Sequence, residues 1–148
     1  MSKTPKVVAV LLYIAGVVMI VAGAGTWYTV SDSLATERIT VTEDASCQAG
    51  QGVNGPLEAY CMADIIAVHA LEATGGKTYA ELDREDPLRA VAQSASFLRA
   101  SLFTSVVAFG VAAFAMGVGL LMLIIGAGIS SLDNRTRAAA LPAETVNA

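Results

Sequence analysis

The sequence predicts a mostly α-helical membrane protein: a two-helix transmembrane hairpin with a small disulfide-tied extracytoplasmic α+β insertion. Three observations predict this class. The 148-residue chain is 55% hydrophobic with a mean hydropathy of +0.60, whereas soluble domains are about 45–50% apolar. Charged residues make up only 15% and are absent from two long blocks, 7–30 and 100–132. The two cysteines both lie between these blocks. This pattern excludes an ordinary soluble enzyme and a basic nucleic-acid-binding protein.

The first uncharged block, residues 7–30, is the expected first transmembrane helix. As a helix it rises about 36 Å, enough to cross a hydrocarbon core of about 30 Å. Trp27 and Tyr28 lie at its far end, where aromatic side chains favour the headgroup layer. A cleaved signal peptide is the alternative, because residues 22–24 resemble a cleavage site. Since the apolar run continues past this site, we favour a retained span.

The second uncharged block, residues 100–132, is the expected second transmembrane helix. At about 50 Å it is longer than one bilayer crossing requires. We therefore expect a helix that begins outside the membrane, near Pro87. The Asp86 side chain can accept hydrogen bonds from the first N–H groups of this helix. Proline suits the first helical position because the N–H that it lacks would have no partner within the helix there.

The charge distribution predicts the orientation of both helices. The tails, 1–6 and 133–148, together carry a formal charge of +2. The middle segment, 31–99, has eleven acidic and five basic residues, a formal charge of −6. Basic residues favour the cytoplasmic side. We therefore expect a multi-pass protein of the plasma membrane, with both termini cytoplasmic and the middle segment extracytoplasmic.

The middle segment contains signals for one strand and two helices. Residues 38–42 alternate apolar and β-branched polar side chains, which predicts a short strand paired with 51–53 or with another chain. Proline at the first position predicts a helix over 56–73, ending at Gly75-Gly76. A capping box over 78–81 predicts a further short helix. The helix over 56–73 is apolar on most sides, so we expect the spans or another protein to cover it.

Cys47 and Cys61 are expected to form a disulfide in the oxidising extracytoplasmic compartment. The bond would close a loop of 15 residues, which the chain-entropy model values at roughly 3 kcal/mol. Two free thiols are the alternative. A redox-active pair is disfavoured because the cysteines do not form a C-x-x-C motif.

Few residues could carry catalysis. His69 is the only histidine; it is either a ligand or proton carrier, or a surface residue near Glu72 on the same helix face. One histidine excludes a bis-histidine haem within the protomer and an iron site of two histidines and a carboxylate. No nucleophile has an evident base, and no glycine-rich phosphate loop is present. We expect no catalytic residue, no cofactor and no metal.

The spans contain small residues at helical spacing and no ionisable side chain. Transport and proton relays usually need an ionisable group in the membrane. Gly110, Ala113 and Gly117 share a face of the second span, and Gly16 and Gly23 share a face of the first. Such residues allow close helix packing in lipid. These faces either pair the two spans with each other or contact another membrane protein.

Four stretches carry a family resemblance: ITVTEDA (39–45), NGPLEAY (54–60), HALEATGGKTYAELDREDP (69–87) and FLRASLFTSVVAFGV (97–111). With them the chain resembles a family of small actinobacterial two-span membrane proteins, often labelled aromatic ring-opening dioxygenases. The single histidine argues against that label. The resemblance implies an association factor, or accessory subunit, of the respiratory supercomplex that joins a menaquinol–cytochrome c reductase to a cytochrome oxidase.

Two functions are therefore expected. The first is a non-catalytic accessory subunit of that respiratory complex, with other membrane protein subunits and lipid as partners. The alternative is a self-associating structural membrane protein of the cell envelope with no respiratory partner. Neither involves nucleic acid.

Overall fold

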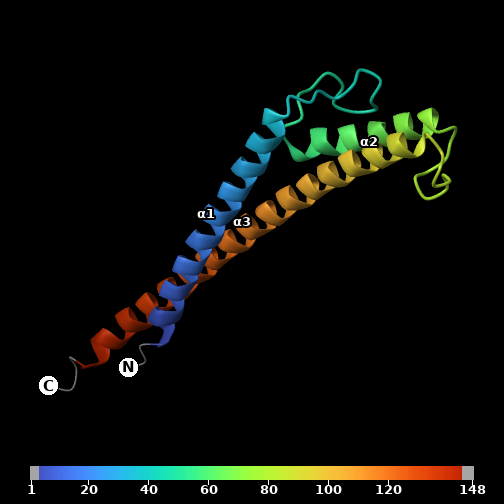
Figure 1. The fold of residues 1–148 in the computed structure, drawn as a ribbon. Coiled ribbons are helices and arrows are strands. Elements are labelled where there is room, and N and C mark those ends of the chain that lie inside the picture. Colours follow the sequence, from blue (N-terminus) through green and yellow to red (C-terminus); the bar gives the residue numbers. More distant parts are fainter. Residues whose placement is uncertain (1–3, 145–148) are drawn as a thin grey trace. The chain divides into compact units, whose positions relative to one another are not determined.

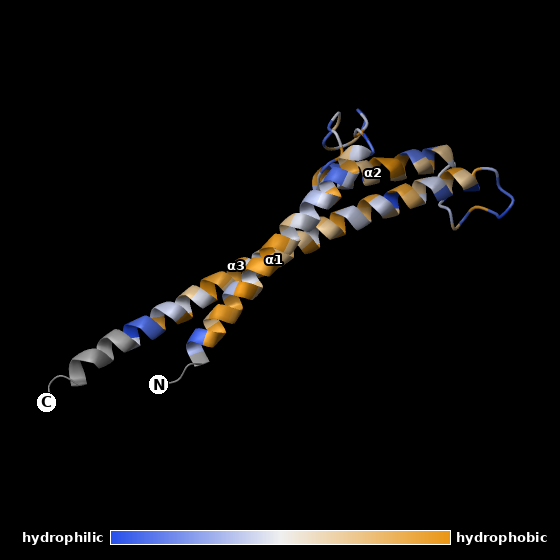
Figure 2. Ribbon diagram, turned by 60° about the vertical axis from the view of Figure 1, so that its left-hand side comes forward, coloured by the Kyte–Doolittle hydropathy of each residue, from blue (hydrophilic) through white to orange (hydrophobic). Residues whose placement is uncertain are grey.

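The computed structural model describes residues 4–144, with side chains over 5–136. Within these residues the chain forms three helices: α1 (Thr4–Thr36), α2 (Pro56–Ala73) and α3 (Arg89–Glu144) (Figure 1). Helices α1 and α3 are both long and apolar enough to cross a membrane, and hydrophobic residues cover long stretches of each (Figure 2). The predicted mostly helical fold with two long apolar helices is confirmed.

The chain divides into two units that share the two long helices. The first unit comprises Met1–Gly25 and Ala112–Ala148, and the second is the continuous segment Thr26–Val111. Each of α1 and α3 therefore contributes one part to each unit.

The first unit is an antiparallel helix pair held together by small residues. A Cβ placed on Gly16 would lie 2.7 Å from the carbonyl oxygen of Gly119, and one on Gly23 would lie 2.7 Å from that of Ala112. This close approach is possible only where side chains are minimal. The small residues at the contact repeat every seven positions, and are Ala9, Gly16 and Gly23 on α1 and Ala112, Gly119 and Gly126 on α3.

Both long helices extend beyond the blocks that predicted them. Helix α3 begins at Arg89, just after the expected Pro87, and the Asp86 carboxylate accepts the Leu88 N–H at 2.9 Å. The same helix continues to Glu144, so the first part of the expected C-terminal tail is helical. The rest of that tail, 145–148, and residues 1–3 lie outside the described part of the chain.

The second unit has its own hydrophobic core. Phe109, Val41 and Val53 are each 1% exposed, and the Trp27 ring lies edge-on to Phe109 with 4.7 Å between centroids. Leu34, Ala59, Cys61, Ala63 and Leu102 complete the buried cluster. Side chains from α1, α2, α3 and the 37–55 loop thus share one core.

The predicted strand over 38–42 is wrong, and with it the α+β description of the insertion. Among the described residues there is no strand, only an isolated antiparallel bridge between Thr40 and Gly52. The segment 51–53 is the partner, since Val53 N–H donates to the carbonyl of Ile39 at 2.8 Å. The pairing stays short because Arg38, with φ of 53°, leaves the extended region.

Helix α2 has the predicted bounds, whereas the short helix expected after the capping box is absent. Glu81 does accept from the backbone N–H and the hydroxyl of Thr78, each at 2.8 Å. The chain then makes only turns before α3. The Arg89 guanidinium donates to the carbonyls of Tyr79 and Leu82, and so stabilises the non-helical path.

Candidate interaction surfaces

The Cys47–Cys61 disulfide is present and joins the 37–55 loop to the first turns of α2, with 5.7 Å between the Cα atoms. Cys61 is 4% exposed and belongs to the core of the second unit. The predicted disulfide is therefore confirmed, and it fixes the irregular loop against the helix.

A second link joins the same loop to α2. His69 Nε2 lies 2.6 Å from Asp44 Oδ2. An ionised carboxylate can only accept, so Nε2 carries the proton in this bond. The hydrogen bond from His69 lowers the pKa of Asp44 below its ordinary value of 3.8. Among the described residues no group of three His, Cys, Asp or Glu side chains could hold a metal ion, and His69 has a structural partner instead.

Helix α2 lies between α3 and the loop, and each neighbour covers one side of it. Toward α3, the Arg99 Nε donates to the carbonyl of Ala63 at 3.2 Å, and the Tyr60 ring lies edge-on to Phe103 at 6.0 Å. Cys61 and Ile65 are buried on another side. Two sides of an apolar helix are thus covered within the unit.

One side of α2 is mostly apolar and only partly covered: Tyr60, whose ring contacts Phe103 of α3, is still 51% exposed. Residues spaced by three or four positions share a helix face, and five exposed residues of α2 follow this spacing. Only one of the five, Asp64, is charged. The four apolar residues of this α2 stripe are Leu57 (63% exposed), Tyr60 (51%), Val68 (44%) and Leu71 (40%).

A separate apolar cavity of about 460 Å³ lies in the second unit beside another side of α2. The polar residues that line it are Glu37 and Ser101. The apolar lining residues come from the end of α1, the loop, α2 and α3, and are Leu34, Ile39, Met62, Ile66, Leu98 and Leu102.

The predicted packing residues fall into two groups. Gly16 and Gly23 lie at the α1–α3 contact. A Cβ placed on Gly110 or Gly117 would have no atom within 4 Å, and Ala113 between them is exposed. Gly117 precedes Gly119 by two residues, about 200° around the helix. The stripe of Gly110, Ala113 and Gly117 is therefore turned away from the α3 face that packs on α1.

Sequence reasoning missed the α3 face that contacts α1. Its signal is the seven-residue spacing of Ala112, Gly119 and Gly126, which matches the spacing of Gly16 and Gly23. A seven-residue repeat keeps one seam of each helix against its partner. Reading this repeat on both helices would have found the contact.

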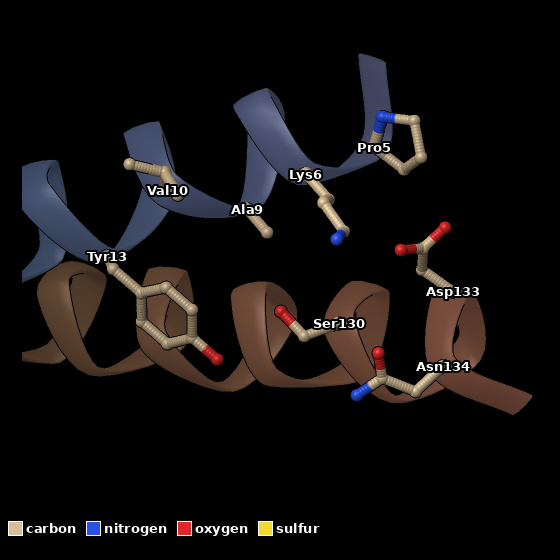
Figure 3. Close-up of a pocket in the computed structure, with 8 residues that line it drawn as sticks. All are labelled: Pro5, Lys6, Ala9, Val10, Tyr13, Ser130, Asp133 and Asn134. Atoms are coloured by element: carbon tan, nitrogen blue, oxygen red, sulfur yellow. The ribbon is translucent and has the colours of Figure 1, made fainter. Parts of the chain in front are cut away.

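A groove with a mostly apolar lining lies in the first unit, near the N-terminal end of α1. It has a volume of about 230 Å³ and contains the side chains of Lys6, Tyr13, Ser130, Asp133 and Asn134 (Figure 3). The sequence did not predict that these residues lie together, because they come from opposite ends of the chain.

Comparison with protein-family models, with curated proteins and with solved structures gave no match to this chain.

Proposed function

We propose that this protein is a non-catalytic accessory subunit that docks on a respiratory membrane supercomplex of menaquinol–cytochrome c reductase and cytochrome oxidase. The observation that carries the docking role is the α2 stripe. Leu57, Tyr60, Val68 and Leu71 are exposed on one face of a helix outside the long apolar stretches of α1 and α3. A contiguous exposed apolar patch usually marks an interaction site.

Charge supports a protein partner for this stripe. Asp64 lies within it, and the segment 31–99 has a formal charge of −6. A partner that presents apolar side chains around one basic residue would complement the stripe. Complementary charge favours binding of the correct partner and raises the rate at which the two proteins associate.

The outward small residues of α3 support a second contact, in the membrane. Gly110 and Gly117 have open space where a side chain would lie. A neighbouring helix could approach the backbone closely there, which is how helices associate in lipid. The resemblance of four stretches within residues 39–111 to small actinobacterial membrane proteins supports the respiratory complex as the host. The charge distribution supports an orientation with both termini cytoplasmic.

The test is to purify the oxidase complex in mild detergent and to measure the amount of this chain per oxidase. We expect a fixed ratio. Gly110→Leu with Gly117→Leu should lower that ratio while the isolated protein stays folded, because a Cβ at either position meets no other atom.

A matched pair of valines tests the α2 stripe. Val68 is 44% exposed and Val91, outside the stripe on α3, is 45% exposed. Val68→Ser should lower the ratio and Val91→Ser should not. If the protein instead runs alone or with copies of itself while the oxidase complex is complete, the envelope alternative replaces the accessory role.

A further inference from the structure

The apolar cavity beside α2 has no part in the docking proposal. It lies within the second unit, and its lining residues come from the end of α1, the 37–55 loop, α2 and α3. Its volume of about 460 Å³ falls within the range of about 300–1,000 Å³ that small-molecule sites occupy. The cavity is therefore large enough to hold a ligand.

The lining of the cavity changes in character from its floor to its mouth. Leu34 and Leu102 form the floor and are 8% and 4% exposed. The half-buried lining residues are apolar, and are Ile39, Met62 and Ile66. Both polar lining residues, Glu37 and Ser101, are exposed and mark the mouth, together with Leu98. A ligand that fits this lining has a buried apolar part and a polar end at the mouth.

The buried part of the cavity suits an aliphatic chain and not a polar ring. No aromatic side chain is among the described lining residues, so a flat ring would have no stacking partner. The buried and half-buried lining side chains also contain no hydrogen-bond donor. The carbonyl oxygens of a buried quinone ring would need such donors, whereas a chain of methylene groups needs none.

The volume of the cavity and its level along the helices fit one such chain. A water-sized group occupies about 30 Å³, so the cavity holds about 15 groups of methylene size. Leu34 lies seven residues after Trp27, and Leu102 lies seven residues before Phe109. Both spacings are about 10 Å along a helix. Because Trp27 contacts Phe109 and is expected in the headgroup layer, the cavity lies just outside the membrane surface.

We propose that this cavity binds a single aliphatic chain of an amphiphile, whose polar end stays at the mouth beside Glu37 and Ser101. The driving force is hydrophobic, because the bound chain removes the side chains of Met62, Ile66 and Leu98 from water. The chain belongs either to a lipid of the adjoining bilayer or to a free amphiphile. This binding does not depend on the docking role of the α2 stripe.

The experiment is photolabelling of the full chain in phosphatidylcholine vesicles with tetradecanol that carries a diazirine in the middle of its chain. Mass spectrometry of the digested protein locates the adducts. We expect adducts on Met62, Ile66 and Leu98 that saturate with probe concentration and disappear with excess unlabelled tetradecanol. Adducts on Val18, which is 60% exposed within the first uncharged block, should rise in proportion to the probe and resist competition. Cavity adducts that also rise in proportion, or no cavity adducts, overturn the proposal.

A matched pair of variants locates the binding. Leu98→Trp should lower the cavity adducts by roughly tenfold, because a larger side chain at the mouth overpacks the occupied cavity. Val91→Trp is the control, since Val91 lies two turns away on the same face of α3, is 45% exposed and does not line the cavity. Both variants should keep the helical circular dichroism of the wild type, because both positions are exposed. An equal loss of cavity adducts in both would contradict the assignment.

Two further probes identify the source and the class of the ligand. Saturable cavity adducts from a phosphatidylcholine with the same diazirine in one acyl chain assign the chain to a bilayer lipid. Adducts from tetradecanol alone assign it to a free amphiphile, and both results support an aliphatic ligand. Stronger labelling of the cavity by a photoreactive quinone than by tetradecanol would overturn the aliphatic assignment.

Discussion

Adding one methyl group to Gly119 should loosen the contact between α1 and α3, whereas adding the same group to Gly117 should not. The two glycines lie two positions apart on α3. A Cβ on Gly119 would lie 2.6 Å from the carbonyl oxygen of Gly16 and 2.8 Å from Cγ1 of Ile20. A Cβ on Gly117 would have no atom within 4 Å.

The expected magnitude follows from these distances. Real Cβ atoms essentially never approach closer than 3.0 Å, so Gly119→Ala forces the helices apart by at least about 0.4 Å at this point. Such overpacking costs about 1–3 kcal/mol. Both substitutions gain the same helix propensity, up to about 1 kcal/mol. The difference between the two variants therefore isolates the packing cost of about 1–3 kcal/mol.

The assay is the free energy of unfolding of the purified protein in detergent micelles, followed by circular dichroism during a denaturant titration. Gly119→Ala should unfold at lower denaturant than the wild type, and Gly117→Ala should unfold at the same concentration or higher. If the two variants are destabilised equally, the seven-residue seam of small residues is not what holds the pair together.

Three further outcomes are expected. Cys47→Ser should lower the free energy of unfolding by roughly 3 kcal/mol, since it opens a 15-residue loop; an unchanged transition midpoint would contradict this. The pKa of Asp44 is lowered in the folded state, so the stability that its bond to His69 contributes is present above pH 3.8 and is lost as the pH falls through the lowered pKa. His69→Ala should return the Asp44 pKa, measured by NMR titration, toward 3.8, and an unmoved value would refute the assigned cause. Asp86→Ala should cost about 1 kcal/mol through the lost hydrogen bond from the Leu88 N–H in the turn before α3, measurable in the same denaturant titration.

The parts of the fold that sequence predicted are those decided by local physics. The uncharged blocks predicted two long apolar helices, and Pro56 and Gly75 bounded α2 because proline and glycine fix backbone angles at helix ends. The chain has two cysteines, and both were expected in an oxidising compartment, so the sequence predicted a disulfide between them. Each of these predictions depends on a short stretch of sequence or, for the disulfide, on one pair of residues.

The errors arose where tertiary contacts decide local structure. The alternation at 38–42 was interpreted as a strand, but Val41 is buried in a core that only the folded loop creates. The turn after Thr78 is held by Arg89, whose guanidinium reaches back ten residues to Tyr79. The groove between the ends of α1 and α3 could not be predicted from sequence, because Lys6 and Asp133 come together only through the helix pair.

The docking role is tested most directly by photocrosslinking from the α2 stripe in native membranes. A photoreactive amino acid would replace Leu57 or Val68 in turn, with Val91 as the matched control position outside the stripe. The account predicts crosslinks from both stripe positions to a subunit of the reductase–oxidase complex, and no such crosslink from Val91. Crosslinks from the stripe only to lipid or to other copies of this chain would contradict it.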